Sequence, residues 1–327
     1  MNLNFVLSEC TFLRSFIPLI IEGNKRKLIS NMFLIKSNKY TSPYINNNFK
    51  DLFSLHQQYG FGLYDINDLK DYDGITFFVE SSGIDYLVST HKNISITYAI
   101  DFISLYDKYI NKVDYVLFPS RFFAEYYNKL SDKNLYVGLP KYDVVIDKEE
   151  VSKKYMGTNS AQLNKKIALI LYPRLRDVNY IDIERIYELL RFLDFALIVK
   201  TRGKDIISNE KHYGDLYIED YSWYPHTTME LLKIANLVIN FDSCAIKECV
   251  MAKVPIINYN IKPERKLEFL YDYKFAYNIS SNMSSEYSRK QLELMMTTDL
   301  NSEFELAIKN HMFNNVDVCK NILDAVL

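Results

Sequence analysis

Cysteine, an excess of either charge and long apolar runs are all scarce in this chain of 327 residues, and each shortage excludes a class of protein. The four cysteines show no CxxC motif and no cysteine–histidine spacing typical of a metal site. Few, unpatterned cysteines favour a reducing compartment. We therefore expect a cytoplasmic protein without a bound metal ion.

Neither the charge nor the apolar runs point to nucleic acid or to a membrane span. The 39 Lys and Arg residues nearly balance the 41 Asp and Glu residues, so no long-range attraction to polyphosphate is expected. The most apolar early stretch, 4–21, contains Glu9 and Arg14 and follows no basic segment, which excludes a signal peptide and a membrane span. No other stretch reaches about 20 apolar residues. Any membrane contact should be peripheral, at the inner surface.

Short β-branched and aromatic runs alternate with longer amphipathic segments, a pattern typical of parallel strands joined by helices. The pattern stops in the polar stretch 146–166 and then restarts, so we predict an α/β protein with two Rossmann-like domains facing a central cleft. The expected parts are an acceptor domain over 1–145, a linker over 146–166, a donor domain over 167–310 and a C-terminal helix over 311–327 that crosses back to the first domain.

The strand and helix of residues 236–260 offer a place for a diphosphate. A buried strand ends at Asp242, and a helix is expected from about Ala245 to Lys253, so its free N–H groups could bind an anion. A carboxylate inside this helix could accept hydrogen bonds from a ribose. The alternative is that the polar residues cap the helix and the carboxylate is solvated. The candidate donor-binding residues here are Asp242, Ser243, Cys244, Ala245 and Glu248.

Basic residues follow two other predicted strands of the second domain. Arg174 lies in the loop 171–177, and Lys200 and Arg202 lie in 197–205. Both loops should open on the same edge of the sheet as Ser243, where guanidinium and ammonium groups would neutralise a leaving phosphate. The alternative is a solvated, basic rim.

Two residues of the first domain are candidate general bases. His91 follows a predicted strand over 85–90, and a histidine titrates near neutral pH. Glu9 lies in the first strand-to-helix loop. A structural hydrogen bond at His91 and a helix cap at Glu9 are the competing interpretations.

Five segments, in order, resemble the CDP-glycerol glycerophosphotransferase family and its GT-B relatives. His91 matches that family's catalytic histidine, and Gly138, Pro140 and Asp143 match its glycine-x-proline-x-x-aspartate signature. The segment after the histidine departs from the family, and a second histidine–proline pair is absent. The similar segments are THKNISI (90–96), DYVLFPSRFFAEYY (114–127), VGLPKYDVV (137–145), ALILYPRLRD (168–177) and NLVINFDSCAIKECVMAKVPIINY (236–259).

The resemblance implies a GT-B transferase that moves a sugar from a nucleotide-diphosphate donor to a glycan acceptor during surface polysaccharide synthesis. The donor is a substrate, and no cofactor or metal is implied. Three alternatives stay open: a CDP-glycerol-type polyol-phosphate transferase, a UDP-sugar 2-epimerase-like enzyme, and a non-catalytic glycan-binding scaffold.

Overall fold

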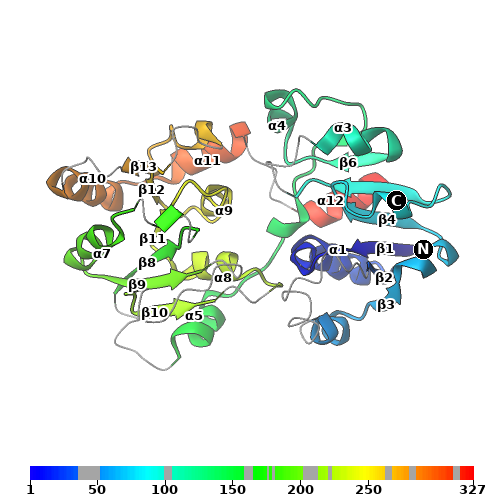
Figure 1. Cartoon of the computed structure of the whole chain (residues 1–327), viewed down its shortest axis with the longest axis horizontal. Coiled ribbons are helices and arrows are strands. Elements are labelled where there is room, and N and C mark those ends of the chain that lie inside the picture. The colour runs from blue at the N-terminus through cyan, green and yellow to red at the C-terminus, as the bar shows by residue number, and fades with distance from the viewer. Residues whose placement is uncertain are drawn as a thin grey trace. The chain divides into compact units, whose positions relative to one another are not determined.

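The computed structural model describes most of the chain and divides it into two compact units (Figure 1). Unit 1 comprises Met1–Val144, Ser222–Tyr224 and Lys309–Leu327, and unit 2 comprises Val145–Tyr221 and Pro225–Ile308. The described residues are 1–35, 52–98, 105–157, 165–174, 177–178, 181–201, 213–219, 223–261, 267–279, 285–311 and 317–327. Among them, no helix combines the length and the apolarity that a membrane crossing requires.

Unit 1 is built on a parallel sheet with the strand order β3-β2-β1-β4-β5-β6-β7. Helices on its faces cover the central strands on both sides, so β1 and β4 are almost continuously buried, including the polar side chains of Asn4 and Thr76. The strands are β1 (Asn2–Leu7), β2 (Ile29–Leu34), β3 (Gly62–Asp65), β4 (Ile75–Val79), β5 (Lys92–Ile96), β6 (Tyr115–Leu117) and β7 (Asn134–Leu135).

The helices of unit 1 bury one apolar face each. In α1 (Leu13–Lys25), Phe16, Leu19 and Ile20 are fully buried. The C-terminal helix contacts α1, as Figure 1 shows for the red and dark-blue ribbons. The other helices are α3 (Tyr106–Tyr109), α4 (Arg121–Tyr126) and α12 (Val318–Val326), with short 3-10 helices including Cys10–Phe12 and Pro140–Tyr142.

The glycine-x-proline-x-x-aspartate segment holds the start of α12. Gly138 adopts a positive φ of 86°, and Pro140 opens a 3-10 turn. The carboxylate of Asp143 then accepts the backbone N–H of Cys319 at 2.7 Å, which satisfies a free donor of the first turn of α12. This signature therefore has a structural role within unit 1.

Unit 2 contains a second parallel sheet, with the order β10-β9-β8-β11-β12-β13. Its central strands are continuously buried from Ile167 to Leu171 and from Phe195 to Lys200. The strands are β8 (Lys166–Leu171), β9 (Phe195–Lys200), β10 (Leu216–Ile218), β11 (Leu237–Asn240), β12 (Ile256–Tyr259) and β13 (Ala276–Ile279). The helices are α5 (Lys148–Met156), α7 (Ile183–Phe192), α8 (Thr227–Ile234), α9 (Ile246–Met251), α10 (Ser285–Thr297) and α11 (Asn301–His311).

The stretch 146–166, expected as a linker, contains the helix α5. The side chain of Asp147 accepts the N–H of Glu150 at 2.8 Å and caps this helix. Val151 and Met156 are buried, and Lys154 forms an ion pair with the buried Glu230 of α8. The polar composition of this segment concealed a helix that packs on unit 2.

The strand predicted over 85–90 is wrong. Ile84–Tyr86 forms a 3-10 turn, and the strand of this region is β5, which begins at Lys92. The N–H of His91 donates to the carbonyl of Val88 at 3.0 Å and closes a second turn before the strand. The strand was therefore predicted several residues too early in the chain, so His91 precedes the strand and does not follow it.

Candidate functional site

Each sheet has one point at which the direction of strand addition reverses. In unit 1 it lies between β1 and β4, and in unit 2 between β8 and β11, so both sheets contain the order 3-2-1-4-5-6 of doubly wound folds. Ligands of such sheets bind beyond the carboxyl ends of the strands at this point. The residues that follow β1, β4, β8 and β11 are therefore the first candidates for a site.

Two basic side chains follow the neighbouring strands β8 and β9 of unit 2. Lys200 ends β9, pairs in register with Leu171, and is only 5% exposed. Its ammonium donates to the carbonyl of Thr201 at 3.1 Å. Arg174 follows β8 and is exposed. The two cations predicted for this edge thus lie on adjacent strand exits, whereas Arg202 lies outside the described residues.

Asp242 shapes the loop that follows β11. Its backbone adopts a positive φ of 47°, and its carboxylate accepts the N–H of Ile261 at 2.7 Å and the amide of Asn258 at 2.8 Å. These bonds occupy both carboxylate oxygens and connect the exits of β11 and β12. The structure therefore supports a loop-positioning role for Asp242. Of the next residues, Ser243 is exposed, and its hydroxyl accepts the N–H of Ala245 at 3.3 Å.

A ladder of asparagines on adjacent strands holds this loop through hydrogen bonds. Asn240, Asn258 and Asn278 are in register on β11, β12 and β13, and the first two are fully buried. The amide of Asn240 donates to Asn258 at 2.9 Å and to the Tyr271 hydroxyl at 3.0 Å. Sequence analysis missed this network, although an asparagine near the end of each of three apolar strands was a visible signal.

The helix α9 buries more polar residues than expected. Glu248 is 7% exposed and Lys247 is 3% exposed, so the alternative that Glu248 is a solvated acid is wrong. Cys244 is half-buried before the helix. Burial raises the pKa of the Cys249 thiol well above its usual value, which makes that cysteine a neutral core residue. Glu248 thus lies in the first turn of the helix that follows β11, where it is largely shielded from solvent.

Glu9 lies at the switch point of unit 1. It follows β1 with an extended backbone and precedes the 3-10 helix Cys10–Phe12. Its carboxylate accepts the Thr11 hydroxyl at 3.2 Å, and its side chain is half-buried. The hydroxyls of Ser8 and Ser82 hydrogen-bond to each other and join the exits of β1 and β4. Glu9 therefore stands where a ligand of this sheet is expected.

His91 lies at the opposite, amino edge of the same sheet. It precedes β5, is 5% exposed, and its Nδ1 hydrogen-bonds to the Thr76 hydroxyl near the start of β4 at 2.8 Å. Burial lowers the pKa of the imidazole. The expected position after a strand was wrong because the strand follows the histidine, and the geometry favours the structural interpretation that the sequence left open.

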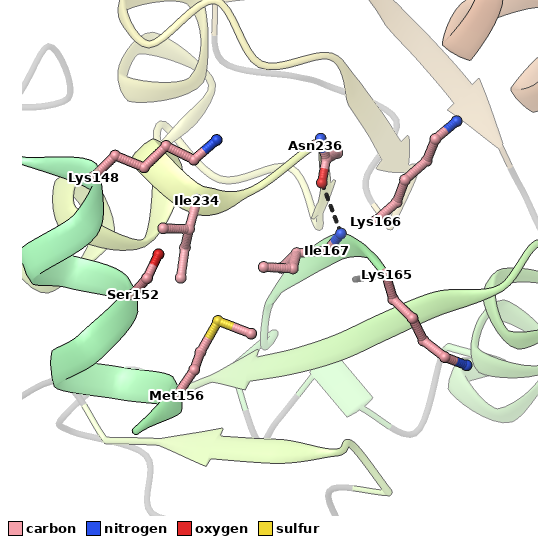
Figure 2. A pocket seen from close by; sticks show the side chains of 8 residues that line it. All are labelled: Lys148, Ser152, Met156, Lys165, Lys166, Ile167, Ile234 and Asn236. Carbon is pink, nitrogen blue, oxygen red and sulfur yellow. Dashed lines mark hydrogen bonds between the residues drawn. The ribbon is translucent and has the colours of Figure 1, made fainter. Parts of the chain in front are cut away.

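A separate hollow of about 270 Å³ lies at the amino edge of the second sheet (Figure 2). The side chain of Asn236, just before β11, accepts the N–H of Ile167 at 2.8 Å within it. The hollow lies at the end of the strands away from Arg174 and Lys200, so it is no part of the candidate site. Its lining residues are Lys148, Ser152, Met156, Lys165, Lys166, Ile167, Ile234 and Asn236.

Acidic side chains are candidate ligands for a metal ion. The chain's Asp-x-Asp sequence, Asp71-Tyr72-Asp73, precedes β4 and therefore also lies at an amino edge. Within the described ranges, no three His, Cys, Asp or Glu side chains converge into a cluster that could hold a metal ion.

Comparison with known proteins identifies the fold. No known protein family and no curated protein matches the chain. Among solved structures, it is similar to the kitacinnamycin glycosyltransferase, with a TM-score of 0.61, 10% identity, and 100% and 99% of the two chains covered.

Two further structures extend the range of activities. The wall teichoic acid polymerase TagF has a TM-score of 0.63 and 12% identity over 100% of this chain and 88% of its own. The UDP-GlcNAc 2-epimerase of Methanocaldococcus jannaschii, solved with UDP-GlcNAc and UDP, has a TM-score of 0.61 and 14% identity over 99% of both chains. The α/β class with two Rossmann-like domains of the GT-B type is therefore confirmed.

Proposed function

We propose that this chain is a GT-B glycosyltransferase that moves a sugar from a nucleotide-diphosphate donor to a glycan acceptor. The observation that carries the proposal is the composition of the carboxyl edge around the β8/β11 switch point, where Arg174 follows β8, Lys200 ends the neighbouring strand β9, and the loop from Asp242 to Ala245 follows β11. Cations at such an exit suit a diphosphate. Glycosyltransferases and nucleotide-sugar epimerases among the structural neighbours support this assignment.

The second sheet would hold the donor. Arg174 and Lys200, with Arg202, would neutralise the negative charge that develops on the leaving nucleoside diphosphate. The backbone N–H groups near Ser243, Cys244 and Ala245 would contact the phosphates, and Glu248 would hold the ribose hydroxyls. Because these groups supply the charge stabilisation themselves, transfer without a metal ion is part of the proposal.

The first sheet would bind the acceptor. Glu9 would take the proton of an acceptor hydroxyl while that oxygen attacks the anomeric carbon of the donor. The bond between this carbon and the diphosphate oxygen breaks, and a nucleoside diphosphate leaves. Glu9 is preferred to His91 as the base because its position follows β1 at the carboxyl edge, whereas His91 is buried at the amino edge.

The proposed setting is surface polysaccharide synthesis on the cytoplasmic side of the membrane, with peripheral contact at most. The partners would be the activated sugar and the growing glycan.

The test is ligand stabilisation followed by product analysis. CDP, UDP, GDP, ADP and dTDP are each added to the protein, with and without divalent metal, and the melting temperature is measured. A ligand that binds the folded state at 100 times its Kd stabilises it by about 2.7 kcal/mol. One selective nucleoside diphosphate is expected to raise the melting temperature without metal. If none does and no donor is consumed, the proposal is wrong.

The likeness to TagF favours transfer of a polyol phosphate from a CDP-activated donor as the second candidate. The two reactions differ in the bond that breaks, since phosphoryl transfer releases CMP and glycosyl transfer releases a nucleoside diphosphate. An epimerase would instead convert the donor without any acceptor, and a non-catalytic scaffold would bind glycan with no turnover. The same product analysis separates all four.

A further inference from the structure

A second carboxylate, Glu80, lies at the same switch point as Glu9 and has no role in the function proposed above. It directly follows β4 and is 8% exposed. Its carboxylate accepts the backbone N–H of Tyr98 at 3.1 Å, and its own N–H donates to the carbonyl of Ile96 at 3.0 Å. The hydroxyl of Ser95 also donates to its carbonyl at 3.1 Å. Glu80 therefore joins the exits of β4 and β5 through both backbone and side chain.

The backbone at Glu80 is unfavourable for this residue type. Its φ is +52°, in the left-handed region that favours glycine. Burial of a carboxylate is a second unfavourable contribution. A glycine at this position would avoid both but would lose the hydrogen bond to the Tyr98 N–H, so that contact is the feature of Glu80 that could matter for the site.

Two sets of contacts connect Glu80 with Glu9. Ser82, two residues after Glu80, hydrogen-bonds through its hydroxyl to Ser8, the neighbour of Glu9. The ring of Tyr98, whose N–H Glu80 binds, lies edge-on to Phe12 at 5.4 Å between centroids. Phe12 in turn donates its N–H to the carbonyl of Glu9 at 3.0 Å. A movement at Glu80 would therefore reach the loop that carries Glu9 from two sides.

We propose that Glu80 is a positioning residue for Glu9: by holding the Tyr98 N–H, it fixes the exits of β4 and β5 against the loop that presents the Glu9 carboxylate to the acceptor hydroxyl. The proposal rests on the function proposed above. It assigns Glu80 to orientation of the base and leaves donor binding to unit 2.

The experiment is a kinetic double-mutant cycle with Glu80→Gly, Glu80→Gln and Glu9→Gln. Glycine relieves the left-handed backbone, so Glu80→Gly should fold, and we expect its kcat to fall about 10- to 100-fold with an unchanged nucleotide-induced shift in melting temperature. Glu80→Gln should stay within about threefold of wild type, because an amide oxygen also accepts the Tyr98 N–H. In the Glu9→Gln background, Glu80→Gly should change the rate by less than about twofold.

A buried carboxylate elsewhere controls for lost stability. Glu230 is 4% exposed and ion-paired with Lys154 in unit 2, so Glu230→Gln should lower the melting temperature and leave kcat unchanged. Additive effects of Glu80→Gly and Glu9→Gln would overturn the proposal, as would equal losses in Glu80→Gly and Glu80→Gln. A wild-type protein that binds no nucleoside diphosphate would overturn the proposed function, and the role of Glu80 with it.

Discussion

The two switch points share a strand order and differ in the side chains placed there. The exits of β1 and β4 present the carboxylates of Glu9 and Glu80, whereas in unit 2 Arg174 follows β8 at the switch point and Lys200 ends the neighbouring strand β9. A carboxylate can accept the proton of a hydroxyl, and cations can neutralise a phosphate. The carboxyl edge of unit 2 thus adds cations beside the hydrogen-bonded carboxylate of Asp242, which suits a donor, whereas Glu9 in unit 1 suits an acceptor.

The two exits are also stabilised differently. Around Asp242, buried asparagines of adjacent strands hold the loop through several side-chain hydrogen bonds. Around Glu9, a serine pair and the left-handed Glu80 hold it. Substitutions that affect one exit should therefore leave the function of the other intact.

The largest effect is expected from Glu9→Gln. Loss of a general base should lower the transfer rate by a factor of about 10² to 10⁴, because the amide cannot accept the proton of the hydroxyl. The nucleotide-induced shift in melting temperature should be unchanged. Glu22→Gln is the matched control, since Glu22 lies at the end of α1 and pairs with Arg26. An unchanged transfer rate in Glu9→Gln would remove Glu9 from the mechanism and leave the acidic exit without a function.

Lys200→Met tests the basic exit. Removal of one group that stabilises developing charge typically lowers the rate by about 10²- to 10³-fold, and stabilisation by the nucleoside diphosphate should also decrease. Activity assays and thermal shifts measure both effects. Lys166→Met is a control within the same sheet, because Lys166 begins β8 at the amino edge. Equal losses of activity in both variants would mean that the donor does not bind at the carboxyl edge of the sheet.

Asn258→Ala tests the support of the donor loop. The substitution removes one hydrogen bond of the Asn240 amide and two hydrogen bonds of Asp242, so we expect a loss of about 2 to 3 kcal/mol in the free energy of unfolding. Nucleotide affinity should fall about tenfold as the loop relaxes. Urea unfolding and titration calorimetry measure the two quantities.

Asn278→Ala provides the comparison within the asparagine ladder. The hydrogen bond from Asn258 to Asn278 is 3.5 Å long and only part-buried. Its loss should therefore lower the free energy of unfolding by less than about 1 kcal/mol. If both substitutions weaken stability equally, the ladder acts as a general core feature and does not position the donor loop.

The sequence predicted the fold where burial is continuous. The runs are apolar from Ile167 to Leu171 in β8 and from Phe195 to Val199 in β9, so the ends of these strands, with Arg174 and Lys200, were located correctly. The same reasoning failed at β5, because its buried Asn93 and Ser95 look polar in the sequence. The amide of Asn93 donates to the nearby carbonyl of His91, whereas the hydroxyl of Ser95 donates to the carbonyl of Glu80, which only the fold brings close.

Other features of the site depend on register and backbone angles. The asparagine ladder requires β11, β12 and β13 to align, which no single segment encodes. The positive φ of Glu80 has no signal in the sequence, which reads there as the ordinary end of a strand. The exits could thus be predicted, but the residues that hold them in place could not.

The smallest effect is expected from His91→Gln, which compares the two edges of the first sheet. Loss of the bond to Thr76 should cost about 1 kcal/mol of stability, while the transfer rate should stay within about threefold of wild type, because the proposed site lies at the carboxyl edge of the sheet. A fall of 10²-fold or more in rate at an unchanged melting temperature would instead restore His91 as the base.

The pH dependence of stability gives a second measurement on the same variant. Because burial lowers the pKa of His91 from 6.5, the unfolded state binds more protons, and this contribution to stability is present above pH 6.5 and lost as the pH falls below it. Burial also lowers the pKa of His311, so the His91→Gln variant retains the part of the pH dependence that comes from His311. His91→Gln should therefore show a shallower, not a flat, loss of unfolding free energy below pH 6.5. Equal slopes in the two proteins would mean that His91 is solvated and free to reach a ligand, and the acidic exit would then lose its claim to be the sole source of a base.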